Sequence, residues 1–542
     1  METARASLVV LGQVLVAASP SGVETAEAIA VGADGRVLAS GSRDQVLPGA
    51  PGARLLDVRD AAVVPGLHDF HLHLVGMARA RGELRLDDAE GPEQVAAAVL
   101  QAAAHLPAGE WLRGRGWLER HMTLATLAAL ERVDVPALLY SHDAHSAWAS
   151  QAALRAAGIG AGTKDPPGGR IERGADGQPT GVLRERATDV VEPVAGRLRG
   201  ARLRAQLHHV GTELLAMGVT SVVDAGDTSD RNGEGAFAAL GDRASALLDE
   251  GEALDGRLRV AVGLPAAGLP AAPGLGVRSN DRVSGTATMR WGWAKAYMDG
   301  ALGSRTAALF EPYTCGPRDA GIVRLEPAEI DAILRAARAA RIGVAMHAIG
   351  DRAVADALDA VERAGAPLPG TPPDRVEHLQ LVRGQDVPRL ARMDVTASIQ
   401  PVHCASDRAL VEECWNDRVA RAYPWRAFRD GGVRLASGSD APIETPNPWH
   451  ALFAAVHRRF PGDGTPDWRP DQALTSAEGL AALTIDAARA ARSDDLGHLR
   501  PGALADFAVL DTGLAALLAA DERLEHVRAQ LTFVDGNEVH RA

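Results

Sequence analysis

Eight short strand-like runs recur through the middle of the chain, and helical spacing appears between several of them. Ala353, Ala357, Leu358 and Val361, for example, repeat every three to four residues, as on one buried face of a helix. Strands that alternate with helices indicate a parallel sheet, and eight such repeats predict a TIM-type (β/α)₈ barrel. The strand-like runs are residues 61–65, 219–224, 258–264, 294–299, 342–347, 375–378, 395–400 and 433–437.

Both ends of the chain have a different pattern, in which short apolar runs are joined by turns. The strand-like runs are residues 8–17, 28–39, 505–511 and 531–535. The second run contains an Asp-Gly turn, which favours a hairpin, and we expect the first to be two strands around a turn at Gly12. We therefore expect residues 1–64 and 487–542 to form one small β-sandwich domain.

The barrel pattern is interrupted once, between its first and second strands. The intervening segment is far longer than an ordinary connection and contains apolar runs and a turn-rich stretch of its own. We interpret residues 86–205 as an inserted subdomain at the mouth of the barrel, and residues 65–85 and 206–486 as the barrel. Near its end, Thr475-Ser-Ala-Glu is a capping box that predicts a helix running towards Ala491.

Composition narrows the function. The 542 residues include 57 Lys and Arg against 70 Asp and Glu, a net charge of −13, which argues against binding a nucleic-acid backbone. No run of 18 apolar residues exists, so no membrane span is expected. We expect a small-molecule substrate as the partner, and a homodimer stays open.

Cysteines are few and odd in number, at positions 315, 404 and 414. This count argues against a disulfide framework, and none of the three lies in a Cys-x-x-Cys pair. We expect three free thiols and a reducing, cytoplasmic compartment. Residues 8–17 faintly resemble the apolar core of a signal peptide, but strands are the preferred interpretation.

Histidines and one aspartate follow four of the predicted barrel strands. His71 and His73 come in Asp-Phe-His-Leu-His, where residues i and i+2 of a strand point to the same side. His347, His378 and Asp440 each lie at or just past a later strand, where barrel enzymes place catalytic groups. Neutral imidazoles and a carboxylate suit Zn²⁺, with Mn²⁺, Fe²⁺ or Co²⁺ as alternatives. We predict one or two divalent cations at these residues.

Here the chain resembles a known family. The opening at residues 65–73, the later single histidines and the Gly-Ser-Asp at 438–440 are similar to the metal-dependent amidohydrolase superfamily. More narrowly, the chain resembles the branch that contains N-substituted formamide deformylases and exoenzyme regulatory proteins. Further similar segments are residues 143–148, 168–173, 179–185, 298–306 and 497–506. The resemblance covers nearly the whole chain, insertion included.

The resemblance assigns roles to the metal ligands. It implies that His71 and His73 bind the more buried metal with Asp440. His347 and His378 would bind a second metal, or complete or assist a single site.

The resemblance also singles out Lys295. In many relatives a lysine on the fourth strand is carboxylated by CO₂ and bridges two metals, and Lys295 occupies that place. Burial lowers the pKa of a lysine and exposes the neutral amine that CO₂ needs. A salt-bridged structural lysine is the alternative.

Four further residues are candidates for substrate contacts. The resemblance places His145 and Trp148 near the substrate, with structural packing as the alternative. Arg305, after the fourth strand, is a candidate for binding a substrate carboxylate, and Glu185 for orienting a ligand in the pocket.

These parts predict a hydrolase of carbon–nitrogen bonds in amides, formamides or cyclic amides. A bound metal lowers the pKa of water towards about 7, Asp440 acts as general acid and base, and a histidine such as His378 assists at the oxyanion. An esterase or lactonase would use the same residues. A non-catalytic regulatory or binding protein is the alternative from another class, but such a protein predicts a degenerate ligand set.

Overall fold

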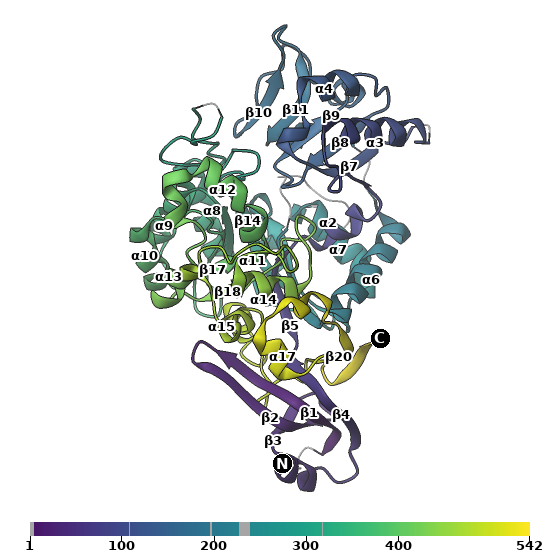
Figure 1. Cartoon of the computed structure of the whole chain (residues 1–542), viewed down its shortest axis with the longest axis vertical. Coiled ribbons are helices and arrows are strands. Elements are labelled where there is room, and N and C mark those ends of the chain that lie inside the picture. The colour runs from purple at the N-terminus through teal and green to yellow at the C-terminus, as the bar shows by residue number, and fades with distance from the viewer. Residues whose placement is uncertain (1–4, 108, 196–197, 227–238, 317) are drawn as a thin grey trace.

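The computed structural model describes residues 5–107, 109–195, 198–226, 239–316 and 318–542. Within these ranges the named strands form three sheets. The barrel lies in the middle of the elongated molecule, with the sheet of the chain ends below it and the sheet of the insertion above it (Figure 1).

The central sheet is an eight-stranded parallel barrel in the described part of the chain, which confirms the predicted fold class. After the last strand, the N–H of Asp440 donates to the carbonyl of His71 over 2.7 Å, which brings the two edges of the sheet together. Most of the strands are buried along their whole length, as expected for a parallel sheet covered by helices. In spatial order the strands are β5 (Leu67–Leu72), β12 (Val219–Asp224), β13 (Arg259–Pro265), β14 (Met289–Tyr297), β15 (Val344–Ala348), β16 (Arg375–His378), β17 (Thr396–Ile399) and β18 (Leu435–Ser437).

The first barrel strand is β5, and the prediction that residues 61–65 form it is wrong. Val63 and Val64 end strand β4 (Arg54–Pro65), where they pair with strands from both chain ends. The chain crosses to the barrel at Gly66, where a Cβ atom would lie 2.0 Å from the side chain of Thr220. Two adjacent apolar runs therefore serve two different sheets.

Helices surround the barrel. In α9 the predicted stripe of Ala353, Ala357, Leu358 and Val361 is buried. The capping box at Thr475 is present, but the helix ends at Ala482 and a second helix follows. None of the helices in the described ranges is both long enough and apolar enough to span a bilayer. The helices are α2 (Leu74–Ala80), α6 (Gly200–Ala216), α7 (Asp242–Glu250), α8 (Pro327–Ala340), α9 (Asp351–Ala364), α10 (Val387–Arg392), α11 (Pro401–Ser406), α12 (Arg408–Cys414), α13 (Trp425–Asp430), α14 (Pro448–His457), α15 (Ser476–Ala482) and α16 (Ile485–Ala490).

The two chain ends share one seven-stranded sheet in the described residues. Its core includes Phe507 and Phe533, whose rings stack at 4.4 Å. Strand β1 runs unbroken past Gly12, so the expected turn there is wrong; the pairing shifts register between Leu11 and Val14 instead. In spatial order the strands are β21 (Asn537–Arg541), β20 (Ala529–Val534), β19 (Phe507–Leu510), β4, β1 (Ala6–Ser19), β2 (Gly22–Gly32) and β3 (Val37–Gly41); α1 (Arg43–Val46) and α17 (Leu514–Ala519) accompany them.

The insertion has a six-stranded sheet of its own within the described ranges. Val95, Val99, Trp117, Leu139 and Trp148 form part of its core. In spatial order the strands are β10 (Gly169–Arg173), β11 (Pro179–Glu185), β9 (Ser146–Ala149), β8 (Ala137–Ser141), β7 (Leu112–Trp117) and β6 (Leu84–Arg85), with helices α3 (Pro92–Ala104), α4 (Leu124–Leu130) and α5 (Gln151–Ala156).

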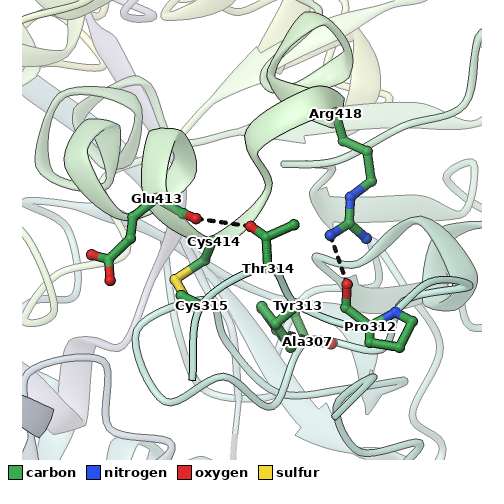
Figure 2. The surroundings of a disulfide bond; sticks show 8 residues. All are labelled: Ala307, Pro312, Tyr313, Thr314, Cys315, Glu413, Cys414 and Arg418. Carbon is green, nitrogen blue, oxygen red and sulfur yellow. Dashed lines mark hydrogen bonds between the residues drawn. A yellow bond between two sulfur atoms is a disulfide. The ribbon is translucent and has the colours of Figure 1, made fainter. Parts of the chain in front are cut away.

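Two cysteines form a disulfide, which corrects the expectation of three free thiols. Cys315, in the loop after β14, is bonded to Cys414 at the end of α12 (Figure 2). The hydroxyl of the neighbouring Thr314 donates to the carbonyl of Glu413 over 2.8 Å. Of the three cysteines only Cys404 is a free, buried thiol. The pair could not be predicted from the sequence because 99 positions separate its members, and the expectation of a reducing compartment loses this support.

Candidate metal centre and active site

The carboxyl ends of several barrel strands meet at one cavity. His71 comes from β5, His347 from β15 and His378 from β16, while Asp440 follows β18. All four line this cavity together with His73 and Lys295. Every residue that the sequence singled out as a metal ligand therefore faces the same space.

Three of these residues could hold one cation. Ligand atoms of His71, His378 and Asp440 all lie within 4.8 Å of one another. His71 Nε2 is 3.2 Å from Asp440 Oδ1, close to the separation of roughly 3.3 Å between two ligand atoms on a tetrahedral zinc ion. His71 Nε2, His378 Nδ1 and Asp440 Oδ1 are buried and have no hydrogen-bond partner among the described residues. Because unsatisfied buried polar atoms are costly, a divalent cation fits this donor set.

Local charges keep these groups in the states that a metal needs. Burial, together with the neighbouring charges of His71 and Lys295, holds the pKa of His378 well below its usual value, so its imidazole is neutral. Burial would raise the pKa of Asp440, but the nearby His71 and a hydrogen bond from His403 to Oδ2 hold it well below its usual value. A neutral imidazole and an ionised carboxylate are both available as ligands.

Carboxylates orient two of the histidines. The Nδ1–H of His71 donates to Glu377 over 2.6 Å, and Arg375 holds that carboxylate at 2.7 Å. His347 Nδ1 lies 3.2 Å from Asp299, which also accepts the N–H of Gly350 over 2.8 Å. A carboxylate on Nδ1 leaves Nε2 as the lone-pair nitrogen, the usual arrangement behind a metal-binding histidine.

His73 and His347 stand beside the three-residue cluster. Arg243 donates to His73 Nδ1 over 2.8 Å, which places the proton of a neutral imidazole on Nε2, facing Asp440 Oδ1 at 3.1 Å. This contact does not have the geometry of a hydrogen bond, so Asp440 Oδ1 stays without a hydrogen-bond partner among the described residues. The ring of His347 lies 4.6 Å from the ring of His378. A second metal position between these two rings stays a prediction.

Lys295 is buried in the same cavity, only 3% exposed. Its Nζ has no hydrogen-bond partner among the described residues and lies 4.9 Å from the centre of the Tyr297 ring. Burial lowers the pKa of Lys295 to about 8, although Glu377 and Asp440 act in the opposite direction. A salt-bridged structural lysine is not what the described contacts show.

Two of the four substrate candidates line the cavity. The ring of His145 lies 4.9 Å from that of His347, and His145 Nδ1 lies 3.0 Å from a carboxylate oxygen of Glu185. Glu185 also accepts hydrogen bonds from Thr306 over 2.5 Å and from Arg324 over 2.9 Å. Glu185 thus ties the insertion to the loop after β14.

The other two candidates lie elsewhere. Trp148 packs in the core of the inserted sheet with Trp117 and Leu139 and does not line the cavity of the metal-ligand candidates. Arg305 lies in the loop after β14 and does not line the cavity of the metal-ligand candidates. Neither is retained as a substrate contact.

Sequence reasoning missed His403, Glu377 and Asp299. His403 Nε2 lies 3.1 Å from Asp440 Oδ2, on α11 just after β17. The rule that polar groups after barrel strands converge could have found His403. Charged residues inside buried strands are a second signal, and Glu377 is one.

A second cavity adjoins the first and shares His145, His347, His378 and Asp440 with it. Apolar side chains form much of its wall, namely Trp117, Leu302, Ile349, Leu410 and Phe460. The candidate centre therefore lies between a charged space and a more apolar one, which is a common design of small-molecule sites.

A parallel barrel with buried imidazoles and a carboxylate at its carboxyl end is the arrangement expected of a metal-dependent hydrolase. Residues 54–540 match the model of the amidohydrolase family, so the chain belongs to that family. This confirms the resemblance seen in the sequence. The protein is accordingly a hydrolase that acts on carbon–nitrogen bonds.

Known proteins resemble the chain over nearly its whole length. It is 30% identical over 525 residues to the putative amidohydrolase YtcJ of Bacillus subtilis, covering 94% of each chain. It is 29% identical over 538 residues to the N-substituted formamide deformylase of Arthrobacter pascens, covering 93% of each. An uncharacterised metal-dependent hydrolase from Pyrococcus furiosus has a solved structure that is 25% identical, with a TM-score of 0.69, covering 93% of this chain and 98% of that one.

Proposed function

We propose that this protein hydrolyses the carbon–nitrogen bond of a small amide, formamide or cyclic amide, with Zn²⁺ held by His71, His378 and Asp440. The main support for this proposal is the group of three buried ligand atoms that lack hydrogen-bond partners in the described chain. The similarity to a formamide deformylase supports this substrate class. The intact ligand set also speaks against a purely regulatory role.

The chain's own residues supply the proton transfers. When bound, a divalent cation would activate water and polarise the carbonyl of the substrate. Asp440 is placed to accept the proton of the attacking water and to return it to the leaving amine. His403, 3.1 Å from the second oxygen of Asp440, fixes the orientation of the carboxylate. His378 lines both cavities, and we propose that it stabilises the negative charge that develops on the substrate oxygen.

Lys295 completes the proposal. Its buried amine, which has no hydrogen-bond partner among the described residues, and its lowered pKa suit carboxylation by CO₂, which would give a bridging ligand for a second cation near His347. Carboxylation replaces a costly buried cation by an anion that metals can neutralise.

A matched substrate panel tests the proposed function. The metal-loaded protein is assayed with formamides, acetamides and lactams of simple amines, beside the formate and acetate esters and lactones of the same shape. We expect turnover of at least one carbon–nitrogen series, lost after treatment with a chelator and restored by Zn²⁺. Turnover of esters and lactones alone, or amide turnover that survives complete metal removal, contradicts the proposal.

A further inference from the structure

Arg115 is a buried cation without a direct partner in the described part of the chain. It lies on β7 of the insertion, its side chain lines the cavity of the metal-ligand candidates, and it is 7% exposed. It makes no side-chain hydrogen bond or ion pair with the described residues, and its Nε is fully buried without a partner.

Other arginines of the same cavity are paired. Arg113 contacts Glu83 at 3.2 Å and Glu192 at 2.9 Å. Arg324 contacts Glu185 at 2.9 Å. Among the described residues, the fold therefore supplies carboxylates to these two guanidinium groups and none to Arg115.

The acidic groups with the largest electrostatic effect on Arg115 already form ion pairs with other residues. Glu83 and Asp87 act on its charge only at longer range, because Arg113 binds Glu83 while Arg85 and His142 bind Asp87 at 2.7 Å and 3.2 Å. A buried guanidinium that is left unpaired costs stability, since its lost hydration is not replaced. An anion that enters the cavity would take the place of the water that the guanidinium loses on burial.

We propose that Arg115 binds a carboxylate group of the substrate. A planar guanidinium matches a carboxylate in a two-pronged hydrogen-bonded pair. One guanidinium among many acidic neighbours suits a singly charged carboxylate better than a doubly charged phosphate. The inference rests on the proposed function, because the carboxylate must belong to the molecule that reaches Asp440.

The two adjoining cavities extend this assignment to the rest of the substrate. Arg115 lines only the charged cavity, whereas Leu302 and Phe460 line only the apolar one, and Asp440 lines both. The substrate class is therefore an amide with a carboxylate on one side of the scissile bond and an apolar group on the other. Arg115 replaces Arg305, the residue that the sequence offered for this role.

Binding of simple acids tests the role of Arg115 without relying on turnover. Benzoate, phenylacetate and 3-phenylpropionate, each beside its neutral primary amide, are titrated into the zinc-loaded protein by calorimetry. The variants are Arg115→Met, Arg115→Lys and the control Arg85→Met. Arg85 pairs with Arg115 across the sheet and carries the same charge, but its side chain is exposed and lies outside the cavity.

We expect the parent to bind at least one acid about tenfold or more tightly than its amide, as charge-assisted hydrogen bonds allow. Arg115→Met should reduce that ratio to near one, Arg115→Lys should keep part of it, and Arg85→Met should keep all of it. The proposal is overturned if the parent and Arg115→Met have the same ratio of acid affinity to amide affinity. That result is expected if the acids bind only at the metal. No preference for any acid in the parent also overturns it.

Thermal unfolding separates this role from a structural one. Replacing a buried, unpaired cation by Met should leave the melting temperature unchanged or raise it, whereas loss of a structural arginine lowers it. A clear fall in melting temperature together with an unchanged acid preference contradicts the inference. Acid binding that depends on Arg115 without turnover of any amide refutes the proposed function alone, so the two failures are distinguishable.

Discussion

Three residues of the cavity have a backbone conformation that side chains rarely adopt. Glu185, His378 and Asp440 have φ values of 51°, 73° and 59°, in the left-handed region. Such conformations persist only where the surrounding structure enforces them, and they concentrate at functional sites. The fold therefore positions these three side chains at the cost of local backbone strain.

At this scale the sequence predicts the candidate ligands but not their supports. His71, His378 and Asp440 could be found because each lies at or just past the carboxyl end of a strand. Glu377 and Arg243 could not be assigned, because their partners are 306 and 170 positions away along the chain. Only the folded barrel shows that one carboxylate orients His71 and that a guanidinium holds His73.

Replacement of Asp440 by Asn tests its role as general base. Asn keeps the size and much of the hydrogen bonding of Asp440 but cannot accept the proton of water. We expect Asp440→Asn to fold normally and to lose at least about a hundredfold in kcat, the lower end of what positioned acid–base groups supply. Steady-state kinetics on a cleaved amide gives the answer. A variant that works near the parental rate removes Asp440 from the mechanism.

Replacement of Lys295 tests the proposed bridge. Lys295→Ala should lose bound metal and activity, and added formate or acetate should restore part of both by occupying the vacated position. Metal content is measured by mass spectrometry of the purified variants. Lys164, the other lysine of the chain, is exposed, and Lys164→Ala is the control. Full metal content and activity in Lys295→Ala would remove the bridge from the account.

At the scale of elements, the pattern predicts seven of the barrel strands and misplaces the first. Residues 61–65 and 67–72 are both strands, and period alone cannot tell which sheet each one joins. The distinction is made by Gly66, where the chain passes too close to Thr220 for any side chain. The insertion was recognised by its length, whereas its strand order depends on contacts that no local pattern encodes.

A histidine joins the insertion to the barrel. His142, after β8, lies 3.2 Å from Asp87 and 3.7 Å from Glu444, which follows β18. Burial lowers the pKa of His142, but these carboxylates outweigh burial and raise the pKa to about 10. A raised folded-state pKa stabilises the protein fully below pH about 6.5, and this contribution is lost as the pH rises towards 10.

His142→Gln should therefore lower the melting temperature by a few degrees at pH 6.5 and converge with the parent near pH 10. His105→Gln, at an exposed histidine after α3, is the control and should follow the parent at every pH. Parallel curves for the parent and His142→Gln would show that the charged histidine does not hold the insertion on the barrel.

The disulfide between Cys315 and Cys414 should contribute to stability, because it closes a long segment of chain. Loss of a crosslink of this span typically costs about 2–4 kcal/mol. Denaturant unfolding of Cys315→Ser/Cys414→Ser should show this loss, and reductant should bring the parent to the same curve. Cys404→Ala controls for loss of a buried thiol. A parent that reductant leaves unchanged would contradict a stabilising role.

At the scale of the whole molecule, the beginning and the end of the chain close on each other. β19 pairs with β4, so strands from both ends of the chain complete the sheet below the barrel. The strand-like pattern at both ends allowed this association to be predicted, but not the order of the strands. The limits 1–64 and 487–542 stay a prediction.

The central claim is that a cation occupies the cluster of His71, His378 and Asp440. Anomalous diffraction at the zinc edge, on crystals grown without chelator, tests it most directly. We expect a peak about 2.0–2.2 Å from ligand atoms of all three residues, with one to two equivalents of metal per chain. An active protein that contains its full complement of metal but shows no peak at these residues would contradict the claim.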